Sequence, residues 1–61
     1  MKIETFKIES EAEANDYLRD LLARPEYRSM AEIEHRAHTV VSGDDLKKYF
    51  VAKGAEILKN T

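Results

Sequence analysis

Residues 10–24, SEAEANDYLRDLLAR, carry the most regular amphipathic pattern in the chain, and we expect the fold to be built around them. Apolar side chains recur there at helical spacing, at Ala14, Tyr17, Leu18, Leu21 and Leu22. Ser10 and Glu13 have the spacing of a capping box, in which each side chain accepts from the other residue's amide. Pro25 disfavours helical backbone at the residue before it. The stretch therefore predicts a helix that begins at Ser10 and ends near Arg24.

The chain has 61 residues, which is the size of one small domain. A domain of this size buries only about 60% of the surface that its unfolded chain exposes, so its core is small. The chain contains no cysteine, so neither a disulfide nor a Cys-based zinc site adds to that core. Self-association is then the usual remaining source of stability. We therefore expect residues 1–61 to form one domain that acts as a homodimer or a higher oligomer.

Hydropathy and charge argue against some classes of protein, such as membrane-spanning proteins and general nucleic-acid binders. No apolar run approaches the roughly 18 residues that a membrane-spanning helix needs, and the N-terminal MKIETFKIES lacks the apolar stretch of a signal peptide. The absence of cysteine suits a reducing compartment. The formal net charge is -2 and the pI is about 5.6, whereas general nucleic-acid binders typically have a pI above about 9. These features predict a cytoplasmic protein without membrane contact, and they do not favour nucleic acid as its partner.

The N-terminal residues 1–9 have the composition of a β-strand. Their apolar side chains occupy two phases of a strand, the first at Met1 and Ile3 and the second at Phe6 and Ile8. A bulge at residues 4–5 would account for the change of phase.

Residues 31–41 fit two templates. With period two, one face of a strand takes Ala31, Ile33, His35, Ala37, Thr39 and Val41. With the helical period, Tyr27, Met30, Ala31 and Ala37 share a face, but Glu34 and His38 intrude and Ile33 is left apart. The strand template fits better, so we expect a strand that pairs most firmly over residues 33–41. Residues 26–36 remain open between strand and helix, and the pairing with residues 1–9 remains open between parallel and antiparallel.

A second helix is predicted from about Asp44 to Leu58. Ser42 and Gly43 end the preceding strand, and Ser42 with Asp45 repeats the capping-box spacing. The apolar side chains of this helix are Leu46, Tyr49, Phe50, Val51, Ile57 and Leu58. They cover an arc of roughly 200°, which is wider than the ~100° stripe that faces one small core. Part of this surface is therefore expected to contact a partner.

The predicted partner interface consists of Tyr49, Phe50, Val51, Ile57 and Leu58. Tyr49 is the strongest single candidate in this set, because tyrosine is enriched at interface hot spots. Gly54 lies beside Phe50 and Leu58 on the helix, and its missing side chain would let another backbone come close, at a helix-propensity cost of about 1 kcal/mol.

A basic edge on the same helix is the only feature that suggests nucleic acid. It would consist of Lys47, Lys48 and Lys59. A solvated role explains these lysines better, because Asp44 and Lys48 form an ordinary i, i+4 pair and Lys59 suits the negative end of the helix.

Candidate catalytic and metal-binding residues are few. His35 and His38 are the only histidines, and on a strand they would point to opposite faces, one partly buried and one exposed, with no third ligand marked by spacing. Ser42, His38 and Asp44 supply the residue types of a catalytic triad, but helix capping explains Ser42 and Asp44 more simply. We therefore expect no catalytic, cofactor or metal site, and no enzyme.

These patterns predict a small α+β domain with the order β-α-β-α, in which two strands carry two amphipathic helices and dimerisation completes the sheet. The expected function is that of a noncatalytic protein-protein interaction module, an adaptor or an inhibitor, acting as a homo-oligomer on a partner that the sequence does not identify. The alternative is a small dimeric DNA-binding regulator of the antitoxin type.

Overall fold

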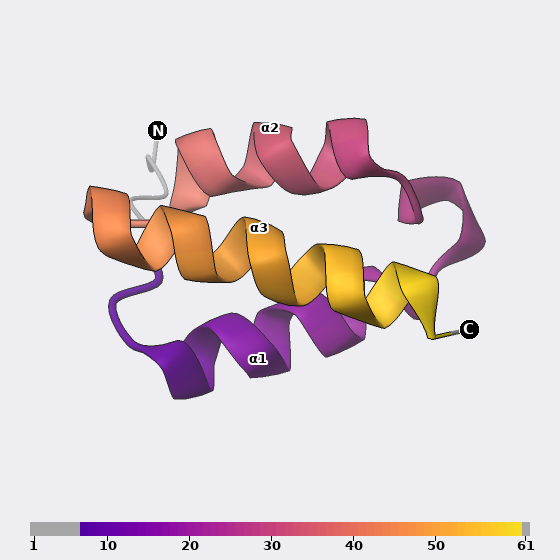
Figure 1. The fold of residues 1–61 in the computed structure, drawn as a ribbon, viewed down its shortest axis with the longest axis horizontal. Coiled ribbons are helices and arrows are strands. Elements are labelled where there is room, and N and C mark those ends of the chain that lie inside the picture. Colours follow the sequence, from indigo (N-terminus) through magenta and orange to yellow (C-terminus); the bar gives the residue numbers. More distant parts are fainter. Residues whose placement is uncertain (1–6, 61) are drawn as a thin grey trace, which may run out of the picture.

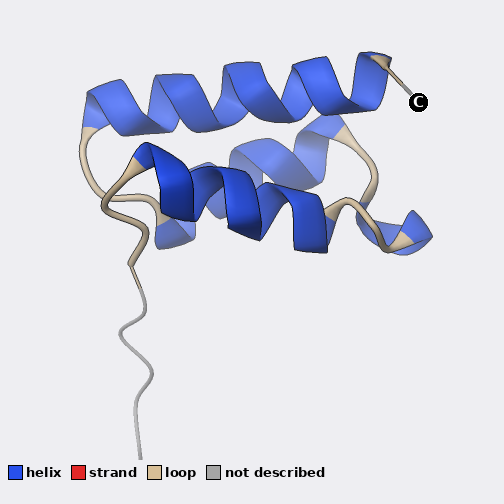
Figure 2. Cartoon of the chain, turned by 90° about the horizontal axis from the view of Figure 1, so that it is seen from below, coloured by secondary structure: helices blue, strands red, loops and turns tan. Residues whose placement is uncertain are grey.

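The computed structural model describes residues 7–60, which form three α-helices and contain no strand. The helices are α1 (Glu11–Leu21), α2 (Met30–Val40) and α3 (Asp44–Lys59), with a short 3-10 helix, η1 (Pro25–Tyr27), before α2. α1 and α3 run in one direction and α2 runs in the other (Figure 1). α3 lies over the gap between α1 and α2 and packs against both (Figure 2). The predicted α+β fold with a two-stranded sheet is therefore wrong for the described residues.

The segment predicted as the second strand is helix α2. Ile33, Ala37 and Val41 are buried and follow one another at intervals of four, a spacing that satisfies both the period of two and the period of 3.6. The positions between them distinguish the two structures. His35 and Thr39 are exposed, as a helix requires, whereas a strand would have placed them on the buried face.

Two serine caps start the first two α-helices. Ser10 accepts a hydrogen bond from the amide of Glu13 at 3.2 Å, which confirms the predicted start of α1. The Glu13 carboxylate accepts from the amide of Glu9, one residue before the predicted donor. Ser29 caps α2 in the same way, with 3.2 Å between its hydroxyl and the Glu32 amide. The motif S-x-x-E at residues 29–32 was therefore the helix signal that the strand interpretation overlooked.

One predicted helix end and one predicted helix cap differ from the structure, whereas α3 begins at Asp44 as predicted. α1 ends at Leu21, three residues before Arg24, and Pro25 opens η1 instead of following the helix directly. α3 has Gly43, at φ 85°, as its N-cap, and no side chain caps it. Glycine reaches this left-handed backbone at low cost. Ser42 therefore does not form the predicted capping box with Asp45.

We expect Ser29→Ala to lower the free energy of unfolding by about 1 kcal/mol, because the Glu32 amide loses its partner. Ser42→Ala is the matched control, since the Ser42 side chain caps no helix, and it should change stability by less than about 0.5 kcal/mol. Urea denaturation followed by circular dichroism measures both values. Equal losses in the two variants would contradict the assigned cap.

The N-terminal segment contacts the connection between α2 and α3. The Ile8 amide donates to the Val40 carbonyl at 2.6 Å, and the Ser42 amide donates to the Ile8 carbonyl at 3.0 Å. These bonds form one isolated parallel bridge between Ile8 and Val41. Of the predicted strand pairing, only this bridge is present in the described residues, and the predicted bulge at residues 4–5 lies outside them.

The core lies between the three helices and under the N-terminal segment. Its buried residues are Ile8, Ala14, Leu18, Leu21, Leu22, Ile33, Ala37, Val41 and Phe50. Phe50 of α3 is fully buried, and its ring lies 5.9 Å from the Tyr17 ring, centroid to centroid. α2 and α3 approach closely at Gly54, where an added Cβ would lie 2.8 Å from two side-chain carbons of Ile33. Gly54, which the sequence suggested as a contact with another backbone, is therefore in contact with the Ile33 side chain of the same chain.

Candidate interaction surface

The predicted partner interface on α3 is largely used inside the domain. Phe50 has no exposed surface, while Val51, Ile57 and Leu58 are half-buried and pack against the core. Because α3 lies against both α1 and α2, its wide apolar arc is filled by two helices of the same chain. The arc therefore no longer requires a second copy, and the homodimer stays a prediction.

Tyr49 connects α3 to α1. Its hydroxyl donates a hydrogen bond to Oδ1 of Asn15 at 2.9 Å, and the residue is half-buried. The rest of the side chain lines a hollow on the outer side of α3. The hydroxyl proton of Tyr49 is thus used within the domain, while its ring lines the hollow.

A groove between α2 and α3 is lined by residues from both the predicted partner interface and the predicted basic edge. It has a volume of about 400 Å³ and is lined by Glu34, Ala37, His38, Lys47, Lys48, Val51 and Ala52. We call it the α2–α3 groove. Val51 was predicted for a protein interface, and Lys47 and Lys48 for a nucleic-acid edge. With two lysines against one glutamate, the lining is positively charged while the whole chain has a net charge of -2.

A second hollow lies on the outer side of α3. It measures about 520 Å³ and is lined by Tyr49, Ala52, Lys53, Ala55, Glu56 and Lys59. Nζ of Lys53 and Oε1 of Glu56 form an ion pair at 3.2 Å. Ala52 is exposed and lines both this hollow and the α2–α3 groove. The three lysines of the predicted basic edge are thus divided, because Lys59 lines a different hollow from Lys47 and Lys48.

The residues considered for catalysis or metal binding do not converge. His35 and His38 are both exposed on α2, so the prediction that one of them is partly buried is wrong. Within residues 7–60, no group of three His, Cys, Asp or Glu side chains is placed to hold a metal ion. Ser42 and Asp44 line a hollow at the N-termini of α1 and α3, whereas His38 lines the α2–α3 groove. These three residues therefore do not share a site.

Sequence reasoning did not single out a cluster of arginine and tyrosine at the other side of α2. Arg36 donates to the Tyr17 hydroxyl at 2.8 Å and to the Glu32 carboxylate, and its guanidinium lies 5.3 Å from the centre of the Tyr27 ring. The i, i+4 spacing of Glu32 and Arg36 was the available signal, but it points to a site only once the helical state of α2 is known.

The part of the chain that the structure describes contains no helix with both the length and the apolar character needed to cross a membrane. Comparison with known protein families, with curated proteins and with solved structures finds no match to this chain.

Proposed function

We propose that the chain is a small cytoplasmic, noncatalytic protein-protein interaction module, an adaptor or an inhibitor, that binds its partner in the α2–α3 groove. The observation that supports this function is the composition of the groove. Its apolar lining comes from Ala37, Val51 and Ala52, and Lys47 and Lys48 stand beside it. An apolar groove between two helices is a common receptor for an amphipathic segment of another protein.

The charge of the α2–α3 groove indicates what kind of partner segment it binds. The aliphatic stems of Lys47 and Lys48 extend the apolar contact while their ammonium groups stay in water. Their charge exceeds that of Glu34, so the groove favours a segment with apolar side chains on one face and carboxylates on its flank.

The alternative function, duplex DNA binding, has less support from the geometry. Contact with a phosphate backbone needs several cations along one edge, but Lys59 lies in a separate hollow from Lys47 and Lys48, and Glu34 lines the groove beside those two lysines.

Ala52→Glu tests the proposal, because a carboxylate placed there blocks the groove from an exposed position without disturbing the core. Tagged wild-type and variant proteins are used to capture partners from the native host, and the affinity for each captured protein is then measured. We expect the variant to bind the partner at least about 30-fold more weakly, which corresponds to about 2 kcal/mol.

Ala12→Glu is the matched control, since Ala12 is exposed on α1 and lines none of the hollows described above. It adds the same charge and should bind like wild type. Equal affinity of wild type and Ala52→Glu, or equal loss in both variants, would contradict the proposal. Sedimentation equilibrium of the same proteins tests whether a second copy of the chain occupies the groove. If it does, the wild-type protein is a dimer, Ala52→Glu is a monomer, and Ala12→Glu remains a dimer.

A further inference from the structure

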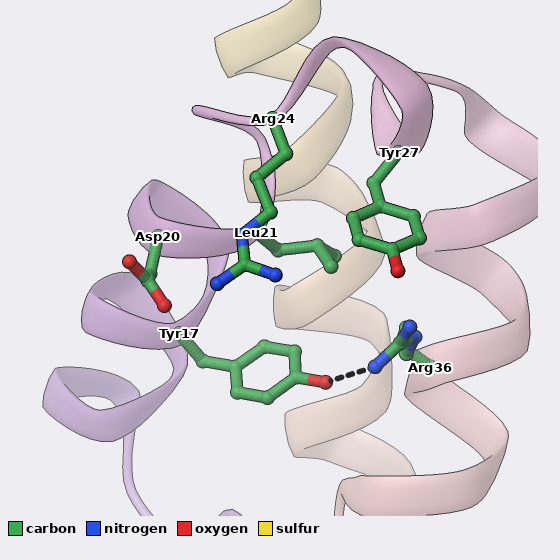
Figure 3. A pocket seen from close by; sticks show the side chains of 6 residues that line it. All are labelled: Tyr17, Asp20, Leu21, Arg24, Tyr27 and Arg36. Atoms are coloured by element: carbon green, nitrogen blue, oxygen red, sulfur yellow. Dashed lines mark hydrogen bonds between the residues drawn. The ribbon is translucent and has the colours of Figure 1, made fainter.

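A pocket lies where the end of α1, η1 and the middle of α2 meet, on a different side of α2 from the α2–α3 groove. Its volume is about 240 Å³, and it is lined by Tyr17, Asp20, Leu21, Arg24, Tyr27 and Arg36 (Figure 3). Four of these six side chains are arginine or tyrosine, the types that combine hydrogen-bond donors with flat surfaces. We call it the arginine pocket.

Arg36 is held in place on one wall of the arginine pocket. One η nitrogen donates to the Tyr17 hydroxyl at 2.8 Å, and Nε donates to the carboxylate of Glu32. The Tyr27 ring centre lies 5.3 Å from the guanidinium carbon, a distance at which the ring face attracts a cation. The pKa of Arg36 lies above its ordinary value because of the hydrogen bonds to Glu32 and Tyr17. The result is a fixed, charged guanidinium whose orientation is set before any ligand arrives.

Arg24 provides a second guanidinium from the opposite side. It is exposed, extends from the segment after α1 and points toward Tyr17 (Figure 3). Within residues 7–60, its side chain makes no hydrogen bond or ion pair. Asp20 is the one acid that lines the pocket, so two arginines and one aspartate give the lining a charge of +1. Glu32 takes Nε of Arg36 and Tyr17 takes one η nitrogen, so the other η nitrogen is left for a ligand.

We propose that the arginine pocket binds a singly charged carboxylate on a flat or short stem, held between the guanidinium groups of Arg24 and Arg36. The Arg24 guanidinium can hold a planar carboxylate with two parallel hydrogen bonds, and the second η nitrogen of Arg36 can donate one more. The Tyr27 ring and Leu21 offer apolar surface to the stem. A dianion such as phosphate is less suitable, because the lining charge of +1 includes the repelling carboxylate of Asp20. The arginine pocket shares no lining residue with the α2–α3 groove.

Two sources present such a group, a free organic acid and an acidic side chain of a peptide. Benzoate probes the first and N-acetyl-glutamate amide the second, with benzamide as the neutral analogue and inorganic phosphate as the dianion. Amide and arginine Nε–H resonances are followed by NMR during each titration. We expect saturable shifts at Leu21, Arg24, Tyr27 and Arg36 with a dissociation constant on the order of 1 mM for at least one carboxylate. The tighter of the two carboxylates identifies the source.

Arg24→Gln should weaken carboxylate binding about tenfold, because it removes one charged donor. Arg19→Gln is the matched control: Arg19 is exposed on α1, outside the pocket, and its substitution makes the same change in net charge. Both substituted residues are exposed, so both variants should keep the wild-type circular dichroism spectrum. The proposal is overturned by the absence of saturable shifts with either carboxylate, by equal binding of benzamide, by tighter binding of phosphate, or by equal weakening in the two variants.

Discussion

Replacing Phe50 by alanine is expected to leave much of the chain unfolded in water at room temperature. Phe50 is fully buried at the contact between α3 and α1, and removal of such a ring typically costs about 3–5 kcal/mol. A domain of 61 residues has a total stability of about 3–9 kcal/mol, at about 0.05–0.15 kcal/mol per residue. The loss of one ring is therefore comparable to the stability of the whole domain.

Circular dichroism at 222 nm, with and without urea, measures the effect of Phe50→Ala. Met30→Ala is the control, because Met30 is a large apolar residue that is 37% exposed, and it should cost clearly less than Phe50→Ala, about 1 kcal/mol. A Phe50→Ala protein that keeps a cooperative transition within about 1 kcal/mol of wild type would contradict the assigned core.

The expected unfolding of Phe50→Ala affects which substitutions can be used to locate the partner surface. Phe50 belonged to the interface predicted from sequence, together with Tyr49, Val51, Ile57 and Leu58. Because its ring supports the fold, a loss of binding in Phe50→Ala would report unfolding and not a partner contact. Ala52, which the apolar pattern did not mark, is the better probe, since it is exposed and lines both hollows of α3.

Two of the three α-helices were predictable from local pattern. The stretch after Ser10 and the stretch after Gly43 each combine a clear start with an apolar face that no strand register reproduces. α2 was not predicted, because Ile33, Ala37 and Val41 fit both periods equally and the cap at Ser29, which marks the start of the helix, was not used. Packing against α3 decides between the two states.

The candidate sites depend on that same helix. With residues 33–41 placed in a strand, Lys47 and Val51 had no neighbouring surface that would make a groove. Arg36 likewise had no reason to meet Tyr17, which is 19 residues away in sequence. Sequence pattern identified several residues of the α2–α3 groove, but which of them share a surface follows from how α2 crosses α3. The arginine pocket is formed by residues of α1, η1 and α2 together, so no short stretch of sequence predicts it.

The contact between α2 and α3 should be unusually sensitive to any side chain at Gly54. An added Cβ would lie 2.8 Å from both Cδ1 and Cγ2 of Ile33, and Ile33 is fully buried. Rotation of the flexible end of Ile33 moves Cδ1 only, so Cγ2 still forces the helices apart. Gly54→Ala gains about 1 kcal/mol of helix propensity, but overpacking costs about 1–3 kcal/mol. We expect a net loss of stability.

Gly54→Leu makes the conflict larger, and we expect it to lower the free energy of unfolding by at least about 3 kcal/mol, at the upper end of overpacking costs. Ala52→Leu is the matched control, two residues earlier on the exposed side of the same helix, and should change stability by less than about 0.5 kcal/mol. Urea denaturation ranks the three proteins. If Gly54→Ala and Gly54→Leu are as stable as wild type, α2 and α3 do not meet at this glycine, and the groove and the burial of Ile33 must be assigned differently.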